Sequence, residues 1–187
     1  SNNGVIVERK FFATSTDPQL AAEAILLINK YKAQVFEADS IGNSVCDLTS
    51  QLLGKNERQV KVINFKSSEK AKNPENYFNR RDEVYHQASL ALKSGSVQMD
   101  DDYTLQCQLN ATTYKKDNGR IFILSKEEVK DKLKSFDKKS SPDRADAWVL
   151  ITDALKYTHS FAEVQAVAPF RNHRGFQDEV RSGQEYG

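Results

Sequence analysis

Residues 34–43 have the sequence QVFEADSIGN, in which a short apolar run ends in an acid and leads into a loop with a glycine. The run Gln34–Asp39 predicts a β-strand, and Ser40–Asn43 predicts the loop after it. Open α/β sheets present their functional sites where strands end. This stretch therefore predicts a strand that carries the carboxylate of Asp39 to the edge of a sheet.

The segments around this strand alternate between strand and helix. Apolar spacing predicts one helix over Leu20–Tyr31 and a second over Val45–Leu53, and a strand over Val60–Phe65. The first residues, Val5–Val7 and Phe11–Ala13, predict a hairpin or two sequential strands. This alternation predicts an α/β sheet with helices packed on its faces.

The second half of the chain adds helices and a hairpin. Helices are expected over Asn76–Leu92 and Lys126–Leu133. The turn Asp117-Asn118-Gly119 predicts a hairpin between Leu105–Tyr114 and Arg120–Leu124, because Asn-Gly suits a tight turn with positive φ.

The stretch SPDRADA, residues 141–147, predicts the start of the last core helix. Proline suits the first turn of a helix, and the helix dipole favours Asp143 there. Asp143 lies one and two turns before apolar residues, so its carboxylate is expected to face the sheet, with Asp146 near it on one flank. The expected buried face consists of Ala147, Leu150, Ile151, Ala154 and Leu155.

These acids admit two interpretations. Carboxylates brought together from a strand end and a helix start repel unless a cation neutralises them, and Mg²⁺ or Mn²⁺ prefer such oxygen ligands. The alternative is that Asp39 is a turn residue and Asp143 a helix cap. The pair Arg80-Arg81 and the lysine-rich stretch from Lys126 to Lys139 are open in the same way, between phosphate contacts and a solvated helix face.

The composition sets limits on class. The 27 basic and 26 acidic residues nearly cancel, so the chain lacks the basic excess of a protein that merely coats DNA. Cys46 and Cys107 have no metal-ligand spacing and are expected to be reduced thiols. No apolar run is long enough to span a membrane. We expect one domain over residues 1–158 and a flexible tail over 159–187.

Several motifs occur in a characteristic order. In this order and at these spacings, the chain resembles the C-terminal nuclease domain of the large terminase subunit of tailed bacteriophages, over residues 4–158. The motifs are FEADSIGN at 36–43, VINF at 62–65, NPENYFNRRDE at 73–83, GRIFI with SKEE at 119–128, and SPDRADA at 141–147.

The resemblance implies a ribonuclease H-like fold: a mixed central sheet flanked by helices on both faces, with an added β-hairpin. It implies a metal-dependent endonuclease that cuts concatemeric double-stranded DNA during genome packaging, by hydrolysis with two Mg²⁺ or Mn²⁺ ions. Asp39 and Asp143 become catalytic metal ligands, and Asp146 an extra ligand or a structural carboxylate. The implied DNA contacts are Arg80, Arg81, Lys126 and Arg144.

The family's pattern also includes an aspartate on the first strand, just before the stretch that Gly4–Val7 resembles, and this sequence has no carboxylate there. No phosphate-binding Gly-x-x-x-x-Gly-Lys-Ser/Thr loop is present. The resemblance therefore implies an ATPase domain of the same polypeptide as a partner, with the portal protein or procapsid and the small terminase subunit. The expected location is the host cytoplasm, without a membrane.

Two other functions stay open. The domain could be a non-catalytic module that docks on the portal or procapsid through the segment after Ser160, which contains Phe161, Phe170 and Phe176. It could also be another ribonuclease H-like nuclease, such as a resolvase or a transposase. A preference for branched DNA would favour that last class.

Overall fold

The computed structural model describes residues 8, 10–12, 14–39, 43–54, 60–99, 101–136 and 141–157. The strand expected at Val5–Val7 and the tail expected over 159–187 lie outside these residues, and Phe11 and Phe12 belong to no strand. Within the described ranges, no helix has the length and apolar character needed to cross a membrane.

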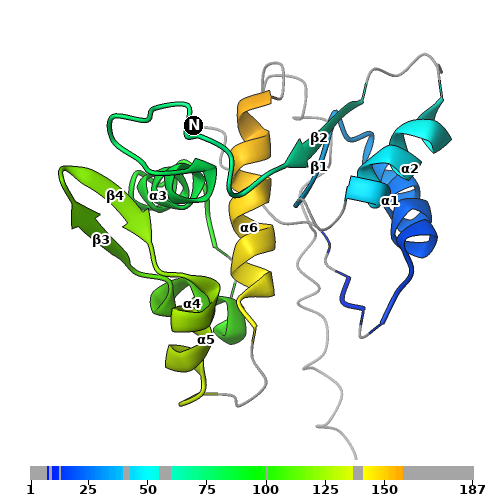
Figure 1. Cartoon of the computed structure of the whole chain (residues 1–187). Helices are drawn as coiled ribbons and strands as arrows, with labels where there is room; N and C mark the ends of the chain where they lie inside the picture. Colours follow the sequence, from blue (N-terminus) through cyan, green and yellow to red (C-terminus); the bar gives the residue numbers. More distant parts are fainter. Residues whose placement is uncertain are drawn as a thin grey trace, which may run out of the picture.

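A parallel strand pair is covered by helices on both faces (Figure 1). Strand β1 (Val35–Asp39) pairs with β2 (Lys61–Phe65), and the register sets Asp39 beside Phe65. Helix α2 (Asn43–Leu53) packs on both strands and against α1 (Asp17–Tyr31). Helix α6 (Asp143–Ala154) contacts β1 from the other side. The predicted α/β class, with helices on both faces of a sheet, is confirmed.

Helix α3 (Arg80–Lys93) begins four residues later than predicted, because Asn79 caps it. The Asn79 side chain accepts a hydrogen bond from the Asp82 backbone at 2.9 Å, and Asp82 accepts one from the Asn79 backbone at 3.2 Å. The second Asp82 oxygen accepts from the backbone of Ile123 at 2.8 Å. One buried carboxylate thus fixes the start of α3 and its distance from the neighbouring strand.

The strand predicted over Leu105–Tyr114 is wrong up to Ala111. Helix α4 (Tyr103–Ala111) occupies this stretch, and the Asp102 side chain caps it by accepting from the Leu105 backbone at 3.0 Å. The sequence LQCQL at 105–109 alternates apolar and polar residues, as a strand does. In the structure, however, Leu105, Gln108 and Ala111 are buried at a helical spacing of three.

The turn itself is placed as predicted. Strands β3 (Tyr114–Asp117) and β4 (Arg120–Ile123) pair antiparallel around Asn118 and Gly119. Both turn residues have positive φ, 48° and 80°, which is the geometry that an Asn-Gly hairpin turn adopts. Helix α5 (Lys126–Leu133) follows as expected, with Ser125 as its cap.

Helix α6 is confirmed, but its predicted buried face is wrong in part: Leu150 and Leu155 are half-buried and pack against the main core, whereas two other predicted residues are exposed. The exposed residues include Ala147 and Ile151, the latter 49% exposed. The buried residues are Ala145, Trp148, Val149, Thr152 and Asp153. At 100° per residue, this rotation turns Asp143 away from the core and sets Asp146 at the margin of the buried face.

The main core joins both halves of the chain. Phe65, Leu105 and Trp148 belong to one cluster that unites β2, α4 and α6 with α3 and β4. A smaller cluster, with Val129 and Leu133, packs α5 beneath α4. Cys46 and Cys107 are free thiols, as predicted.

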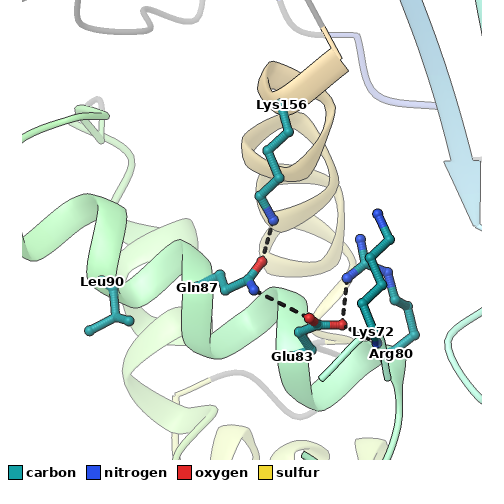
Figure 2. Close-up of a pocket in the computed structure, with 6 residues that line it drawn as sticks. All are labelled: Lys72, Arg80, Glu83, Gln87, Leu90 and Lys156. Carbon is teal, nitrogen blue, oxygen red and sulfur yellow. Dashed lines mark hydrogen bonds and ion pairs between the residues drawn. The ribbon is translucent and has the colours of Figure 1, made fainter. Parts of the chain in front are cut away.

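A buried ion network joins α3 to α6 (Figure 2). Arg80 is 7% exposed, and its guanidinium pairs with Glu83 and with Asp153, each at 2.7 Å. Figure 2 draws the Arg80–Glu83 pair. Burial by itself lowers the pKa of Arg80, but the two carboxylates raise it overall. Lys156 pairs with Asp153 at 2.6 Å and donates to Gln87. The cavity of about 320 Å³ beside this network is lined by Lys72, Arg80, Glu83, Gln87, Leu90 and Lys156.

We predict that Arg80→Met lowers the free energy of unfolding by about 3–5 kcal/mol, because buried Glu83 would lose its cationic partner and Asp153 would keep its contact with Lys156 but lose the one with Arg80. Urea unfolding measures this loss. The matched change Arg120→Met removes a guanidinium that lies over the Phe78 ring, and is expected to cost less than about 1 kcal/mol. Equal stability of Arg80→Met and the parent would contradict the network's structural role.

Candidate active site

A small pocket lies where β1 ends, between α3, α5 and α6. Its volume of about 20 Å³ is room for a single water-sized occupant. Asp39 from the end of β1 and Asp146 from the first turn of α6 both line it. The other lining residues are Phe65, Ser67, Arg81, Val84, Tyr85, Lys126, Val149 and Leu150.

Lys126 is the positive charge of this pocket. Its ammonium lies 2.7 Å from one oxygen of Asp146, and the two side chains are 34% and 16% exposed. Burial lowers the pKa of Lys126, but the hydrogen bond and charge of Asp146, with the charges of Asp39 and Asp143, raise it overall. All three predicted acids therefore act on one ammonium group.

The three acids are not equivalent in position. Asp39 and Asp146 line the pocket, whereas Asp143 is exposed at the start of α6, where its carboxylate accepts a hydrogen bond from Ser141 at 2.8 Å. The rotation of α6 causes this difference, since Asp146 shares a side of the helix with Val149. The expectation that Asp143 faces the sheet and Asp146 flanks it is reversed.

No three acid, histidine or cysteine side chains of the described ranges are grouped closely enough to enclose an ion as they stand. The acids are instead compensated by Lys126, which supplies a cationic partner for Asp146. A carboxylate cluster needs such a counter-charge in order to remain ionised.

Tyr85 holds Asp146 from the other side. Its hydroxyl donates a hydrogen bond to the Asp146 oxygen that Lys126 does not contact. Burial raises the pKa of Tyr85, and the charge of Asp146 raises it further, so the phenol keeps its proton. The sequence analysis missed Tyr85. The available signal was its place one turn after Arg81 on the same helix.

Arg81 lines the pocket, whereas the adjacent Arg80 does not. One guanidinium nitrogen donates to the backbone oxygen of Leu124 at 2.8 Å, and the group lies 4.8 Å from the Tyr85 ring centre. Nε and Nη2 are buried and, apart from the Tyr85 hydroxyl, find no acceptor in the described part of the chain. Buried donors without partners are costly, which suits a site that receives an anion.

The other predicted DNA contacts, Arg80, Lys126 and Arg144, are each paired with an acidic side chain. Arg80 is committed to the network with Glu83 and Asp153, and this placement argues against its contact with a phosphate backbone. Arg144 pairs with Asp102 through contacts of 2.8 and 3.1 Å, and its guanidinium lies over the ring of Phe11. Lys126 belongs to the acid pocket and not to an open basic surface.

Comparison with known proteins finds no matching family model and no matching curated protein. Solved structures do match. The nuclease domain of the large terminase subunit of bacterial virus Sf6 has a TM-score of 0.53 and 18% identity, over 69% of each chain. A lysine-to-alanine mutant of that domain with manganese has a TM-score of 0.54 and 17% identity, over 69% of this chain and 70% of the other.

The same mutant domain with manganese and β-thujaplicinol has a TM-score of 0.57 and 16% identity, over 73% of this chain and 72% of the other. At these identities, the likeness is one of fold. The chain has the fold of that terminase nuclease domain, as the ribonuclease H-like expectation required.

Proposed function

We propose that this chain is a metal-dependent endonuclease that cuts concatemeric double-stranded viral DNA during genome packaging. The observation that carries the proposal is that Asp39 and Asp146 line one pocket with Lys126, whose ammonium lies 2.7 Å from Asp146. The Arg81 guanidinium lines the same pocket, and its Nε and Nη2 have no acceptor among the described residues apart from the Tyr85 hydroxyl. The fold shared with a terminase nuclease domain, which has been solved with manganese and with calcium, supports the same function.

The donor set fits a hard divalent cation. Carboxylate oxygens are the ligands that Mg²⁺ and Mn²⁺ prefer. Three carboxylates against the Lys126 ammonium and the Arg81 guanidinium leave a formal charge of −1. With Lys126 displaced, the formal charge would be −2, which one such ion would balance. We assign Asp39 and Asp146 as the main ligands and Asp143 as a further ligand at the rim. The second ion of a two-metal site also belongs to this proposal.

Divalent ions at such a site lower the pKa of a water and stabilise the charge that develops on a phosphodiester. The chain's own residues do the rest. Asp39 and Asp146 would hold the ions, and the hydroxyl of Tyr85 fixes the orientation of Asp146. The free donors of Arg81 bind oxygens of the phosphate and keep it beside the acids. Phosphate contacts of this kind position DNA without reading its sequence.

In the same proposal, the domain works within a larger packaging machine. Its partners would be an ATPase domain of the same polypeptide, the portal protein or procapsid, and the small terminase subunit, in the host cytoplasm. The competing assignment, a resolvase-like nuclease, is separated by substrate. Branched and linear duplex DNA should be cut at similar rates if the proposal is right.

The first prediction concerns the acids. Asp39→Asn and Asp146→Asn should each lower Mn²⁺-dependent plasmid cleavage about 100-fold, because each removes a charged ligand. Asp143→Asn should lower cleavage less, about tenfold, because Asp143 is exposed and is not among the residues that line the pocket. EDTA should abolish cleavage by the parent.

The matched control is Asp131→Asn, which removes an exposed carboxylate of α5 that pairs only with Lys134 among described residues. It should cut like the parent. Parent-like cleavage by both Asp39→Asn and Asp146→Asn would overturn the assignment of the acids.

The second prediction concerns Lys126. In EDTA, Lys126→Met should lower the melting temperature, because three carboxylates lose their common counter-charge. Mn²⁺ should then raise the melting temperature of the variant more than that of the parent. Lys130→Met, an exposed position on the same helix, serves as control. Equal Mn²⁺-induced shifts in Lys126→Met and the parent would contradict competition between the lysine and the metal.

The third prediction concerns Arg81. Arg81→Gln should raise the KM for DNA or lower the cutting rate by about tenfold or more, the usual cost of losing a hydrogen bond to a charged group. Its affinity for Mn²⁺, measured by titration without DNA, should match the parent's. A loss of Mn²⁺ affinity with an unchanged KM would show that Arg81 supports the acids and does not bind phosphate.

A further inference from the structure

The start of α6 carries two of the three acids, yet it lacks a cap of its own. Pro142 occupies the N-cap position and makes no side-chain hydrogen bond to the helix. The first backbone N–H groups of any helix have no partner within it. Such a turn frays unless another part of the chain supplies acceptors, and fraying would move Asp143 and Asp146.

Gln108 of α4 supplies these acceptors. Its Oε1 accepts hydrogen bonds from the backbone N–H groups of Arg144 at 3.0 Å and Ala145 at 3.1 Å. Its Nε2 donates to the backbone oxygen of Ser141 at 2.7 Å. One side chain, 3% exposed, thus binds the chain on both sides of Pro142.

A second contact holds the same junction. Asp102, the cap of α4, pairs through both carboxylate oxygens with Arg144. Ala145 is fully buried, so solvent has no direct access to replace the Gln108 acceptor at that position. The first turn of α6 is therefore attached to α4 by side chains that do not line the acid pocket.

We propose that Gln108 is a positioning residue for the acid site: it caps α6 from outside and sets where Asp146 stands relative to Asp39. The inference rests on the proposed metal site. Glutamine suits the role because its amide both accepts and donates. A glutamate would keep the acceptors but lose the donor to Ser141, and a methionine of similar length would lose all three hydrogen bonds.

The experiment compares Gln108→Met and Gln108→Glu with the parent in two measurements. Amide hydrogen exchange at Arg144 and Ala145 reports the cap, with Val149 as an internal reference. Mn²⁺ titration without DNA reports the acids. Ile28→Ala, on the buried face of α1, which packs on α2, controls for a general loss of stability.

In Gln108→Met, we expect exchange at Arg144 and Ala145 to rise at least about tenfold relative to Val149, and Mn²⁺ affinity to fall about tenfold. Gln108→Glu should retain the protection of both amides. Ile28→Ala should change neither the ratio of exchange rates nor the Mn²⁺ affinity.

Parent-like Mn²⁺ affinity in Gln108→Met would overturn the positioning role, and so would exchange that rises equally along the whole of α6. A parent that binds no Mn²⁺ would instead overturn the proposed metal site, and the positioning role with it. The parent's own titration therefore separates failure of the proposed function from failure of the inference.

Discussion

The ammonium of Lys126, 2.7 Å from Asp146 and within the field of Asp39 and Asp143, holds together acids that come from distant parts of the chain. Two like charges 4 Å apart repel by about 4 kcal/mol at an effective dielectric constant of 20. That is a large part of the 5–15 kcal/mol by which a typical domain is stable. Acids placed in this way need a nearby cation, and Lys126 supplies that positive charge. In the proposed function, a divalent ion replaces Lys126 as the partner of these acids.

Helix α3 separates two uses of charge. Its adjacent residues Arg80 and Arg81 have different surroundings. The charge of Arg80 is matched by Glu83 and Asp153. Arg81 lines the pocket, and its buried Nε and Nη2 have no acceptor among the described residues apart from the Tyr85 hydroxyl. The ion network of Arg80 joins α3 to α6, and the pocket beside Arg81 contains the acids of the proposed site. The same helix also provides Tyr85, which fixes Asp146. The site is therefore built on an element that the core and the network both hold in place.

Local pattern was enough to predict β1, β2 and most helices, and it placed Asp39 correctly at a strand end. It was not enough to orient α6. Two faces of that helix carry apolar residues, and the face that is buried also contains Thr152 and Asp153. Asp153 is tolerated there because Arg80, 73 residues earlier, pairs with it. Local periodicity cannot reveal a partner so distant in the chain. The predicted positions of Asp143 and Asp146, facing the sheet and flanking it, were therefore exchanged.

The central claim is that Asp39 and Asp146 hold a common divalent ion in place of the lysine contact. Anomalous diffraction from crystals of the protein grown with Mn²⁺ tests it most directly. We expect a manganese peak within coordination distance of the carboxylates of Asp39 and Asp146, with the Lys126 ammonium moved away from Asp146. Manganese bound elsewhere, with the Lys126–Asp146 ion pair intact, would contradict it.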